Sequence, residues 1–377
     1  MVRVLVDTTA LPVNRGGVGR YVDELVARLP GLGADVHVAA QPRDKEHYAA
    51  VVGRDQVHLA PGWANKPAPR LAWEQTGLPL LVRRIRPDVV HSPHYTMPLA
   101  TSLSRRPKQV VTLHDATFFS LPELHLGVKA RFFARWITVA TRRADALIVP
   151  SRATLDEVVA HTGVDPARLT VIPHGVDHDH FQPPTATEVA ELRRWLGLAP
   201  DTAYVAFLGT LEPRKNVPAL IRAYAVACAD LPSPPPLVLA GGRGWDTGID
   251  AALALVPAHL TVLRPGFVPE PLVPALLGGA EVLAYPGFGE GFGLPVLEAM
   301  TCGAPVLTTR RLSMPEVGGD AVAYADSPDE HDLATALTAL LADPDRRRQL
   351  SAAGITRAAA YTWTAAAAAH LAVFDAQ

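Results

Sequence analysis

The sequence predicts an α/β protein with two domains, each built around a doubly wound parallel β-sheet. The chain has 377 residues, which exceeds the usual size of a single hydrophobic core. Hydrophobic residues make up 49% of it, enough to fill a core in each half. Short apolar, β-branched runs alternate with helix-like segments, as in parallel sheets that are buried on both faces.

In the first half, β-strands are expected where apolar runs recur between polar turns: Val2–Val6, Asp35–Ala39, Val89–His91, Gln109–Leu113 and Ala146–Val149. The segments between them have the pattern of helices, for example from about Gly19 to Leu29 and from Val128 to Ala144. This alternation indicates repeated β-α-β units and therefore a parallel sheet covered by helices.

The second half repeats the alternation, with strands expected at Ala203–Leu208, Leu237–Ala240, Thr261–Leu263, Val282–Tyr285 and Pro305–Thr308. Between the halves lies the polar, proline-containing stretch IPHGVDHDHFQPPTATE, which is typical of a linker. We therefore expect a first domain over residues 1–178 and a second over residues 179–357. The alanine-rich residues 358–377 are expected to form a helix, docked back toward the first domain by Tyr361, Trp363 and Phe374.

Composition argues against several classes of protein. The net charge of −2 lacks the basic excess of a nucleic-acid binder. The two cysteines, Cys228 and Cys302, have no metal or redox spacing, which disfavours a disulfide scaffold and favours a reducing compartment. The opening MVRVLVDTTA enters a strand directly, and no run approaches the roughly 18 apolar residues that cross a bilayer. We expect a cytoplasmic protein.

Ligands of doubly wound sheets bind beyond the carboxyl ends of the strands, and two motifs there suggest an anion site. Gly16-Gly17-Val18-Gly19 follows the first strand, where glycines let backbone N–H groups approach an anion at a helix start. A glycine-rich turn without a ligand explains this motif equally well. Arg214 and Lys215, in GTLEPRKN after a strand of the second domain, can bind phosphate oxygens. Most Arg-Lys pairs are solvated surface residues, but the strand-end position favours binding.

A third motif, EGFGLPVLEAM over Glu290–Met300, follows the strand Val282–Tyr285. Pro295 suits the first turn of a helix, which leaves the N–H groups around Phe292–Leu294 available to an anion. Glu290 is expected to bind sugar hydroxyls or developing positive charge, because a carboxylate would repel a phosphate, and Glu298 is expected near the first turn of the helix, within reach of the same cleft. Each glutamate could instead cap the helix, but two acids around Gly-Phe-Gly make capping the weaker explanation.

Histidines supply a further candidate and several weaker ones. His114 follows the strand Gln109–Leu113 and could position a substrate or handle a proton, although a lone histidine at a strand end is more often structural. The Asp177-His178-Asp179 triplet resembles a metal motif with His174 and His180 beside it, but it lies in the linker, which does not promise ligand geometry. His91-x-x-His94 lacks further ligands. No metal site is therefore predicted.

The segment KARFFARWITVATRRA mixes basic and aromatic residues, and two interpretations remain open. It could lie on an anionic membrane surface. A core helix with a solvated basic face fits better, because the polar face is neither continuous nor strongly charged. Peripheral membrane contact is therefore possible but not favoured.

The motifs GGVGRY, TLHDAT, IPHGVD, GTLEPRKN, AGG, PGFVPE and EGFGLPVLEAMTCGAPV, in this order, resemble family 4 of the retaining glycosyltransferases. The resemblance covers nearly the whole chain. It implies the GT-B fold, with two Rossmann-like domains facing a cleft, a nucleoside-diphosphate sugar held by the second domain and an acceptor held by the first. One departure is Pro286-Gly287-Phe288-Gly289, where family members often have Pro-Ser and a bulkier residue.

The resemblance also implies roles for individual residues. Arg214 and Lys215 would hold the diphosphate, Glu298 the ribose and Glu290 the sugar hydroxyls, and His114 would lie beside the reacting sugar. His114, Glu290, Arg214 and Lys215 form the expected catalytic set. The other expected donor-binding residues are Gly16, Gly17, Gly209, Gly241, Phe267, Val268, Gly291, Phe292, Gly293 and Leu294.

Two cations and a helix N-terminus can stabilise a departing diphosphate without a divalent ion, so the expected enzyme is metal-independent and needs no cofactor beyond its sugar-nucleotide co-substrate. Mannose from GDP-mannose, slightly favoured, or glucose from UDP-glucose would pass to an acceptor hydroxyl with retention. Three alternatives stay open: an amine or cyclitol acceptor, a non-catalytic sugar-nucleotide-binding protein and, more distantly, a nicotinamide oxidoreductase.

Overall fold

The structure is a computed structural model that describes residues 1–13, 15–101 and 107–376. Contacts divide the chain into two compact units. Unit 1 comprises Met1–Pro122, Leu126–Gly175 and Trp363–Gln377, and unit 2 comprises Glu123–His125 and Val176–Thr362. The chain thus leaves unit 1, builds unit 2 and returns to unit 1 for its last helix. The predicted boundary at residue 178 lies three residues beyond the observed division after Gly175.

Unit 1 contains a seven-stranded sheet in the order β3-β2-β1-β4-β5-β6-β7, and every neighbouring pair is parallel. Its strands are β1 (Arg3–Asp7), β2 (Asp35–Ala40), β3 (Val57–Leu59), β4 (Val89–Ser92), β5 (Lys108–Thr112), β6 (Ala146–Val149) and β7 (Leu169–Val171). The order reverses between β1 and β4, so the crevice expected of a doubly wound sheet lies at their carboxyl ends.

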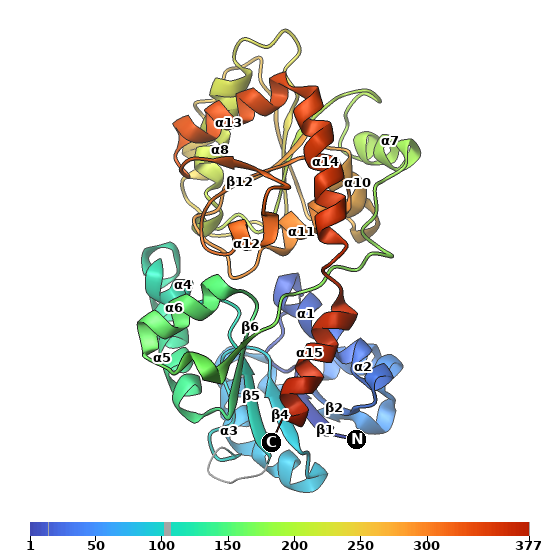
Figure 1. Cartoon of the computed structure of the whole chain (residues 1–377), viewed down its shortest axis with the longest axis vertical. Helices are drawn as coiled ribbons and strands as arrows, with labels where there is room; N and C mark the ends of the chain where they lie inside the picture. The colour runs from blue at the N-terminus through green and yellow to red at the C-terminus, as the bar shows by residue number, and fades with distance from the viewer. Residues whose placement is uncertain (14, 102–106, 377) are drawn as a thin grey trace. The chain divides into compact units, whose positions relative to one another are not determined.

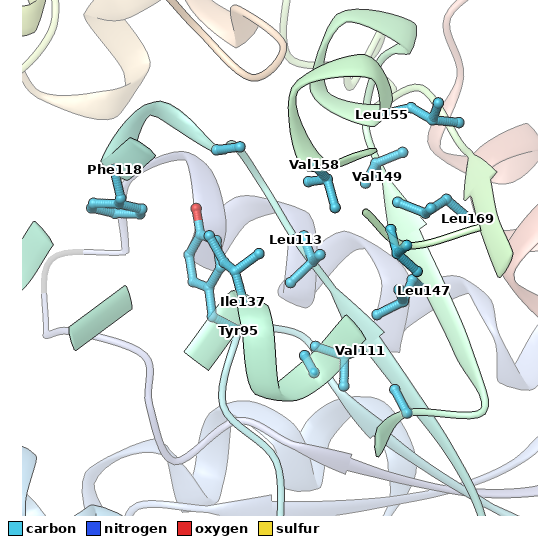
Figure 2. Close-up of a cluster of buried hydrophobic side chains, with 14 of the residues drawn as sticks. Tyr95, Val111, Leu113, Phe118, Ile137, Leu147, Val149, Leu155, Val158 and Leu169 are labelled. Carbon is cyan, nitrogen blue, oxygen red and sulfur yellow. The ribbon is translucent and has the colours of Figure 1, made fainter. Parts of the chain in front are cut away.

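The helices of unit 1 are α1 (Gly16–Arg28), α2 (Lys45–Val52), α3 (Pro67–Ile85), α4 (Thr117–Ser120), α5 (Gly127–Arg143), α6 (Arg152–Thr162) and α15 (Trp363–Asp375). A buried apolar cluster lies between the sheet and α5 and α6 (Figure 2). It includes Val111, Leu113, Leu147 and Val149 from the strands and Ile137 from α5. The α5 helix therefore has a core face, while its arginines are exposed.

Unit 2 contains a six-stranded parallel sheet in the order β10-β9-β8-β11-β12-β13. Its strands are β8 (Val205–Leu208), β9 (Leu237–Ala240), β10 (Val262–Gly266), β11 (Val282–Tyr285), β12 (Val306–Thr309) and β13 (Ala323–Ala325). Its helices are α7 (Ala186–Trp195), α8 (Val217–Cys228), α9 (Ile249–Leu253), α10 (Val273–Gly278), α11 (Leu294–Thr301), α12 (Met314–Gly318), α13 (Glu330–Ala342) and α14 (Pro344–Ala358). The strand order reverses between β8 and β11.

The last helix, α15, packs beside α1 in unit 1 (Figure 1). It starts at Trp363, five residues later than the predicted tail, because α14 runs to Ala358 and a short break follows. Trp363, His370 and Phe374 form part of its buried face. Lys108 donates hydrogen bonds from Nζ to the carbonyls of Val373 and Ala376, each at 2.7 Å, and so caps the helix C-terminus.

The linker is ordered beside the returning chain. Val176 pairs with Thr362 in an isolated parallel bridge, and its N–H donates to Tyr361 O at 3.2 Å. Within the part of the chain that the structure describes, none of the helices combines the length and apolar character needed to cross a membrane.

Candidate functional site

The two strongest sequence motifs follow neighbouring strands of unit 2. GTLEPRKN comes directly after β8, and the loop that leads to EGFGLPVLEAM comes directly after β11. These strands pair in the middle of the sheet, where the strand order reverses. Residues 75 positions apart in the sequence therefore meet beyond the carboxyl ends of these strands, which is where ligands of such sheets bind.

Arg214 is fixed by the loop that follows β11. Its guanidinium donates to Gly289 O at 2.6 Å and pairs with Glu290 Oε2 at 2.7 Å and with Glu212 Oε1 at 2.7 Å. In return, the N–H of Phe288 donates to Arg214 O at 2.9 Å. The segment that departs from the family pattern, residues 286–289, thus braces the arginine.

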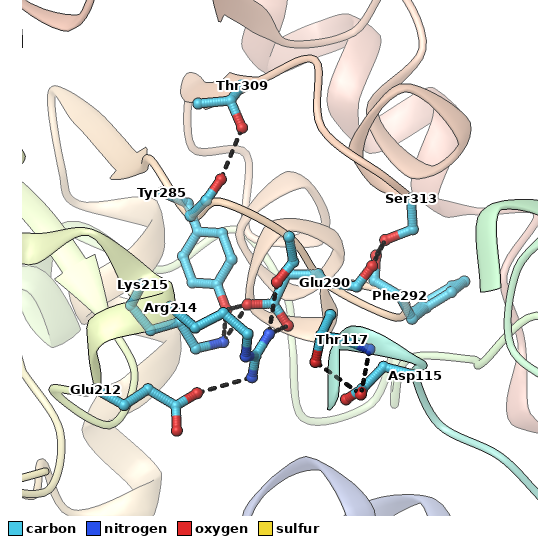
Figure 3. Close-up of polar contacts among 12 residues, drawn as sticks. Asp115, Thr117, Glu212, Arg214, Lys215, Tyr285, Glu290, Phe292, Thr309 and Ser313 are labelled. Carbon is cyan, nitrogen blue, oxygen red and sulfur yellow. Dashed lines mark hydrogen bonds and ion pairs between the residues drawn. The ribbon is translucent and has the colours of Figure 1, made fainter. Parts of the chain in front are cut away.

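Lys215 lies in a buried polar cluster with Tyr285 and Glu290 (Figure 3). Its ammonium donates to the Tyr285 hydroxyl and to Glu290 Oε1. An ammonium has three N–H donors, so one remains for a further acceptor. Burial lowers the pKa of Lys215, while the neighbouring Glu290 opposes that shift and Arg214 adds to it.

Glu290 is the shared partner of both cations, a pairing that the sequence did not predict. Oε1 accepts from Lys215 and from Tyr285, the latter at 3.1 Å, while Oε2 accepts from Arg214. Burial alone would raise the pKa of Glu290, but Arg214 and Lys215 outweigh it and lower the pKa to about 2. A carboxylate has about four acceptor positions, so Oε2 retains one for a hydroxyl group.

The Ser313 side chain stabilises the turn between Glu290 and α11. The Ser313 hydroxyl lies 2.8 Å from Glu290 O and 2.9 Å from Phe292 O, so its hydrogen is shared between two carbonyls. Gly293 has φ +101°, a conformation that favours glycine, and it directly precedes α11. Pro295 is the second residue of this helix, as the motif predicts. The N-terminal end of α11, with its positive partial charge, therefore lies directly after Glu290.

Glycines allow three loops of unit 2 to pack together. A Cβ on Gly241, which has φ +127°, would lie 2.1 Å from Gly209 O, and a Cβ on Gly244 would lie 2.0 Å from Leu211 O. A Cβ on Gly242 would lie 2.7 Å from the Phe267 ring. Gly209 and Gly241 were predicted from the sequence as donor-binding residues, whereas Gly242 and Gly244 were not.

Phe267 and Val268 follow β10 directly. Phe267 is 63% exposed although its ring lies against Gly242, so the residue offers a flat apolar surface. Glu298 is buried and is the fifth residue of α11, close to the first turn of the helix.

The glycine motif of unit 1 forms the start of α1, three residues before the predicted helix start at Gly19. Gly16 has φ +54° and Gly17 is exposed. The preceding Arg15 hydrogen-bonds to Asp44 and to the Tyr48 hydroxyl, each at 3.0 Å. The turn that presents the glycines is therefore tied to the segment that begins α2.

His114 lies at the carboxyl end of β5, two residues beyond the strand. Its Nε2 is 2.7 Å from Pro93 O, and because a carbonyl only accepts, Nε2 has the hydrogen and Nδ1 is the acceptor. Burial lowers the pKa of His114, partly offset by the Pro93 hydrogen bond and by Asp115. The lowered pKa favours the neutral imidazole of His114.

Several residues of the site were not selected from the sequence. Tyr285 was treated as the apolar end of a strand, and Ser313 has no motif signal. Glu212 and Asn216 are part of the quoted GTLEPRKN but received no role. Asn216 has φ +57° and donates to Pro328 O at 2.6 Å, which anchors the loop after the cationic pair.

The histidines near the linker do not assemble into a metal site. Among the described residues, no three His, Cys, Asp or Glu side chains are grouped so that they could hold a metal ion. His178 lies 3.2 Å from Tyr361 O, and His91 lies 2.9 Å from the Thr112 hydroxyl, so both have structural partners.

The comparison with protein families covers both units. Residues 15–180 match the model of Glycosyltransferase Family 4, and residues 188–357 match the model of Glycosyl transferases group 1. The chain belongs to the family 4 glycosyltransferases. Its first unit thus corresponds to the first of these models, and its cationic pair, Glu290 and α11 lie within the second.

Among the relatives, the O-antigen chain mannosyltransferase B of Escherichia coli is 27% identical over 96% of each chain. The D-inositol 3-phosphate glycosyltransferase of Stackebrandtia nassauensis is 29% identical over 93% of this chain and 84% of its own. Among solved structures, Anabaena HepE in complex with UDP-glucose has a TM-score of 0.76 at 17% identity, over 99% of this chain and 100% of its own. This family 4 glycosyltransferase has the GT-B fold, with two Rossmann-like domains.

Proposed function

We propose that the protein transfers mannose or glucose from a nucleoside-diphosphate sugar to an acceptor hydroxyl, with retention and without a metal ion. The observation on which the proposal depends is the pairing of Arg214 and Lys215 with Glu290 where the sheet of unit 2 reverses its strand order. This cluster combines donors for a diphosphate with an acceptor for a sugar hydroxyl at one crevice.

The leaving group determines what such a site must do. When the bond between the sugar and the phosphate breaks, negative charge develops on the diphosphate and positive charge on the sugar. The remaining N–H of Lys215 and the N-terminal end of α11 can stabilise the negative charge on the diphosphate. Arg214 is held beside them by its hydrogen bond to Gly289 O. Glu290 keeps both cations in place and offers its remaining acceptor position to a sugar hydroxyl.

His114 acts from unit 1 in this proposal. Its bare Nδ1 can accept a hydrogen bond from a hydroxyl of the reacting sugar and can stabilise developing positive charge without being charged itself. Gly16 and Gly17 would bring the first amides of α1 to the diphosphate, and Glu298 would bind the ribose. The exposed ring of Phe267 would lie against the nucleotide base.

One relative and one solved structure suggest different donors. The name of the mannosyltransferase favours mannose, and HepE was solved with UDP-glucose. We place GDP-mannose slightly ahead because the mannosyltransferase matches the chain over 96% of both lengths. An acceptor that is a cyclitol remains the second candidate, which the inositol phosphate glycosyltransferase favours.

A thermal-shift panel of nucleotide sugars tests the donor. Only the cognate donor should raise the melting temperature strongly, because it stabilises the folded state by mass action. Lys215→Ala should weaken that shift, whereas Lys45→Ala, an exposed lysine on α2 in unit 1, should leave it unchanged. An unchanged shift in the Lys215 variant would remove this residue from the donor site.

Turnover separates the enzyme from a binding protein and tests the metal. A glycosyltransferase releases the nucleoside diphosphate in the presence of an acceptor, and a binding protein releases none over hours. We expect activity to survive a chelator. If it is abolished and Mg²⁺ restores it, the metal-independent mechanism is wrong. The anomeric configuration of the product, measured by NMR, tests retention.

A further inference from the structure

Four buried side chains of unit 1 form a continuous hydrogen-bonded chain that the proposed mechanism does not use. His91 Nε2 lies 2.9 Å from Thr112 Oγ1, Thr112 Oγ1 lies 2.9 Å from the Tyr21 hydroxyl, and that hydroxyl lies 2.8 Å from His370 Nε2. The four residues come from β4, β5, α1 and α15. Because all four are buried, their polar atoms depend on one another for hydrogen bonds.

The direction of every hydrogen bond in this chain can be derived from one end. His370 Nδ1 lies 2.7 Å from Ala366 O, which only accepts, so Nδ1 has the hydrogen and Nε2 of the neutral ring is an acceptor. The Tyr21 hydroxyl therefore donates to His370. Its single hydrogen is then used, so the Thr112 hydroxyl must donate to Tyr21.

The hydrogens of Thr112 and His91 are assigned in the same way. The Thr112 hydrogen is used on Tyr21, so His91 must donate to Thr112 from Nε2. The Nδ1 atom of His91 is then a bare acceptor, and it has no partner among the described residues. All donors in the chain thus point one way, from β4 toward α15, and both histidines are held in a single tautomer.

The chain passes directly beside His114. The Tyr21 and His114 rings are nearly perpendicular, with centroids 5.1 Å apart, and Thr112 precedes His114 by two residues. Tyr21 also lies one helical turn after Gly17 on α1. The hydrogen bonds of the Tyr21 hydroxyl to Thr112 and His370 fix the Tyr21 ring, which packs against one side of the His114 ring. They also fix the first turns of α1 relative to that ring.

We propose that Tyr21 and His370 are positioning residues for glycosyl transfer, which hold the His114 imidazole in its working orientation through the Tyr21 hydroxyl. This inference rests on the proposed function of His114. It gives the last helix of the chain a part in the reaction, because His370 acts through Tyr21 without touching the substrate. If these four hydrogen-bonded side chains served only to attach α15 to unit 1, breaking their hydrogen bonds would not affect the orientation of His114.

Matched substitutions distinguish a role in positioning His114 from a role in attaching α15. Tyr21→Phe removes the hydroxyl and keeps the ring. Asparagine at position 370 (His370→Asn) reaches only as far as Nδ1 and loses the acceptor for Tyr21, whereas glutamine (His370→Gln) reaches about as far as Nε2 and can present its oxygen. Lys108→Met loosens the C-terminal end of α15 without touching the hydrogen-bonded chain.

We expect Tyr21→Phe and His370→Asn each to lower kcat by about tenfold while the donor KM stays within about twofold, because a small misplacement of a reacting group slows the chemical step. The double variant should be no slower than either single one. His370→Gln should restore most of the rate. Lys108→Met should lower the melting temperature and leave kcat unchanged. Equal kcat in wild type and His370→Asn would overturn the inference.

A second measurement needs no substrate. Long-range ¹H–¹⁵N NMR spectra report the tautomer and environment of each imidazole, so the His114 resonances should move in Tyr21→Phe and His370→Asn and stay in place in Lys108→Met. Unchanged His114 resonances in the first two variants would overturn the positioning role. A wild-type protein without turnover would instead overturn the proposed function, and the spectra would still decide the positioning role.

Discussion

At the scale of single residues, the candidate site depends on how charge is balanced out of water. Arg214 and Lys215 are opposed by Glu212 and Glu290, so four charged groups form a nearly neutral cluster at the end of β8. In such a cluster the buried cations keep a fixed position, and each of them has a carboxylate partner. In the proposed function, a diphosphate would bind at the remaining donor positions without a large rearrangement of side chains.

Glu290→Gln tests this balance. The substitution removes the negative charge between two cations, and we expect a loss of about 3 kcal/mol in the free energy of unfolding at pH 7. In the wild type, the lowered pKa of Glu290, about 2, provides stability above the unfolded value of 4.5 that is lost as the pH falls toward 2. The difference between the two proteins in urea unfolding should therefore shrink below pH 4.5.

Glu330→Gln is the matched control, because Glu330 pairs with Arg222 on the surface of the same unit. Its effect should be within about 0.5 kcal/mol at any pH. A Glu290 variant as stable as the wild type at neutral pH would contradict the charge balance described above.

The buried histidines of unit 1 predict a second pH dependence, of the same sign. Burial lowers the pKa of His370 to about 4 and that of His94 to about 3, and it also lowers the pKa values of His91, His114 and His174. The unfolded chain binds these protons from pH 6.5 downward, so each histidine removes up to about 1.4 kcal/mol of stability per pH unit below that value.

We therefore expect the free energy of unfolding to fall steadily between pH 6.5 and pH 4. Burial raises the pKa of Glu74 to about 6, which works in the opposite direction, so the informative quantity is a difference between proteins. His370→Gln should show a shallower slope than the wild type over this range. Parallel slopes would mean that His370 does not contribute.

At the scale of elements, the sequence predicted the central strands well and the edge strands poorly. Ten apolar runs were predicted as strands, and each of them overlaps an observed one. The three strands that were missed are β3, β7 and β13, each of three residues and each at the edge of its sheet. Segments this short have no detectable period, and they are strands only because a neighbouring strand pairs with them.

The same contrast holds for the loops of the candidate site. The cations and glycines of GTLEPRKN and EGFGLP could be selected because their residue types suit an anion at a strand end. The pairing of Lys215 with Tyr285 and Glu290 could not be predicted. These partners lie 70 and 75 residues after Lys215 in the sequence, so the pairing depends on the paths of two distant loops. Positive φ at Asn216 and Gly293 shapes those paths, and no period in the sequence reports it.

The packing of the glycine loops in unit 2 gives a prediction at this scale. Gly241→Ala places a Cβ 2.1 Å from Gly209 O at φ +127°, whereas Gly266→Ala meets nothing within 4 Å at φ +77°. Both variants strain the backbone by about 1 kcal/mol, but only the first also forces two loops apart.

We expect Gly241→Ala to lose at least about 3 kcal/mol of stability and most of its donor-induced thermal shift. Gly266→Ala should lose about 1 kcal/mol and keep the shift. Similar losses in the two variants would show that backbone conformation alone explains the need for Gly241.

At the scale of the whole molecule, unit 1 depends on a segment that is remote in sequence. Trp363, His370 and Phe374 of α15 lie against Tyr21, His91 and His174 of the first 175 residues. A protein that ends at Thr362 would expose this aromatic surface and leave the Tyr21 hydroxyl without its acceptor, while unit 2 would lose none of its own residues.

We therefore expect the truncated protein to unfold unit 1 at a lower temperature, with little change for unit 2. Hydrogen exchange followed by mass spectrometry assigns the change to residues, and protection should fall in α1 and β5 but remain in β8 and β11. A peptide of residues 363–377 added in excess should restore the protection. Equal loss throughout both units would show that they unfold together.

The return of the chain to unit 1 also orders events during translation. Because the ribosome releases the N-terminus first, the first 175 residues emerge long before their final helix. Unit 2 is contiguous apart from three residues, so it can complete its sheet and its helices while the surface of unit 1 that α15 covers is still exposed. His370 is therefore translated after the whole of unit 2, and a nascent protein stalled before residue 363 would have the cationic pair while the Tyr21 hydroxyl still lacks its partner on α15.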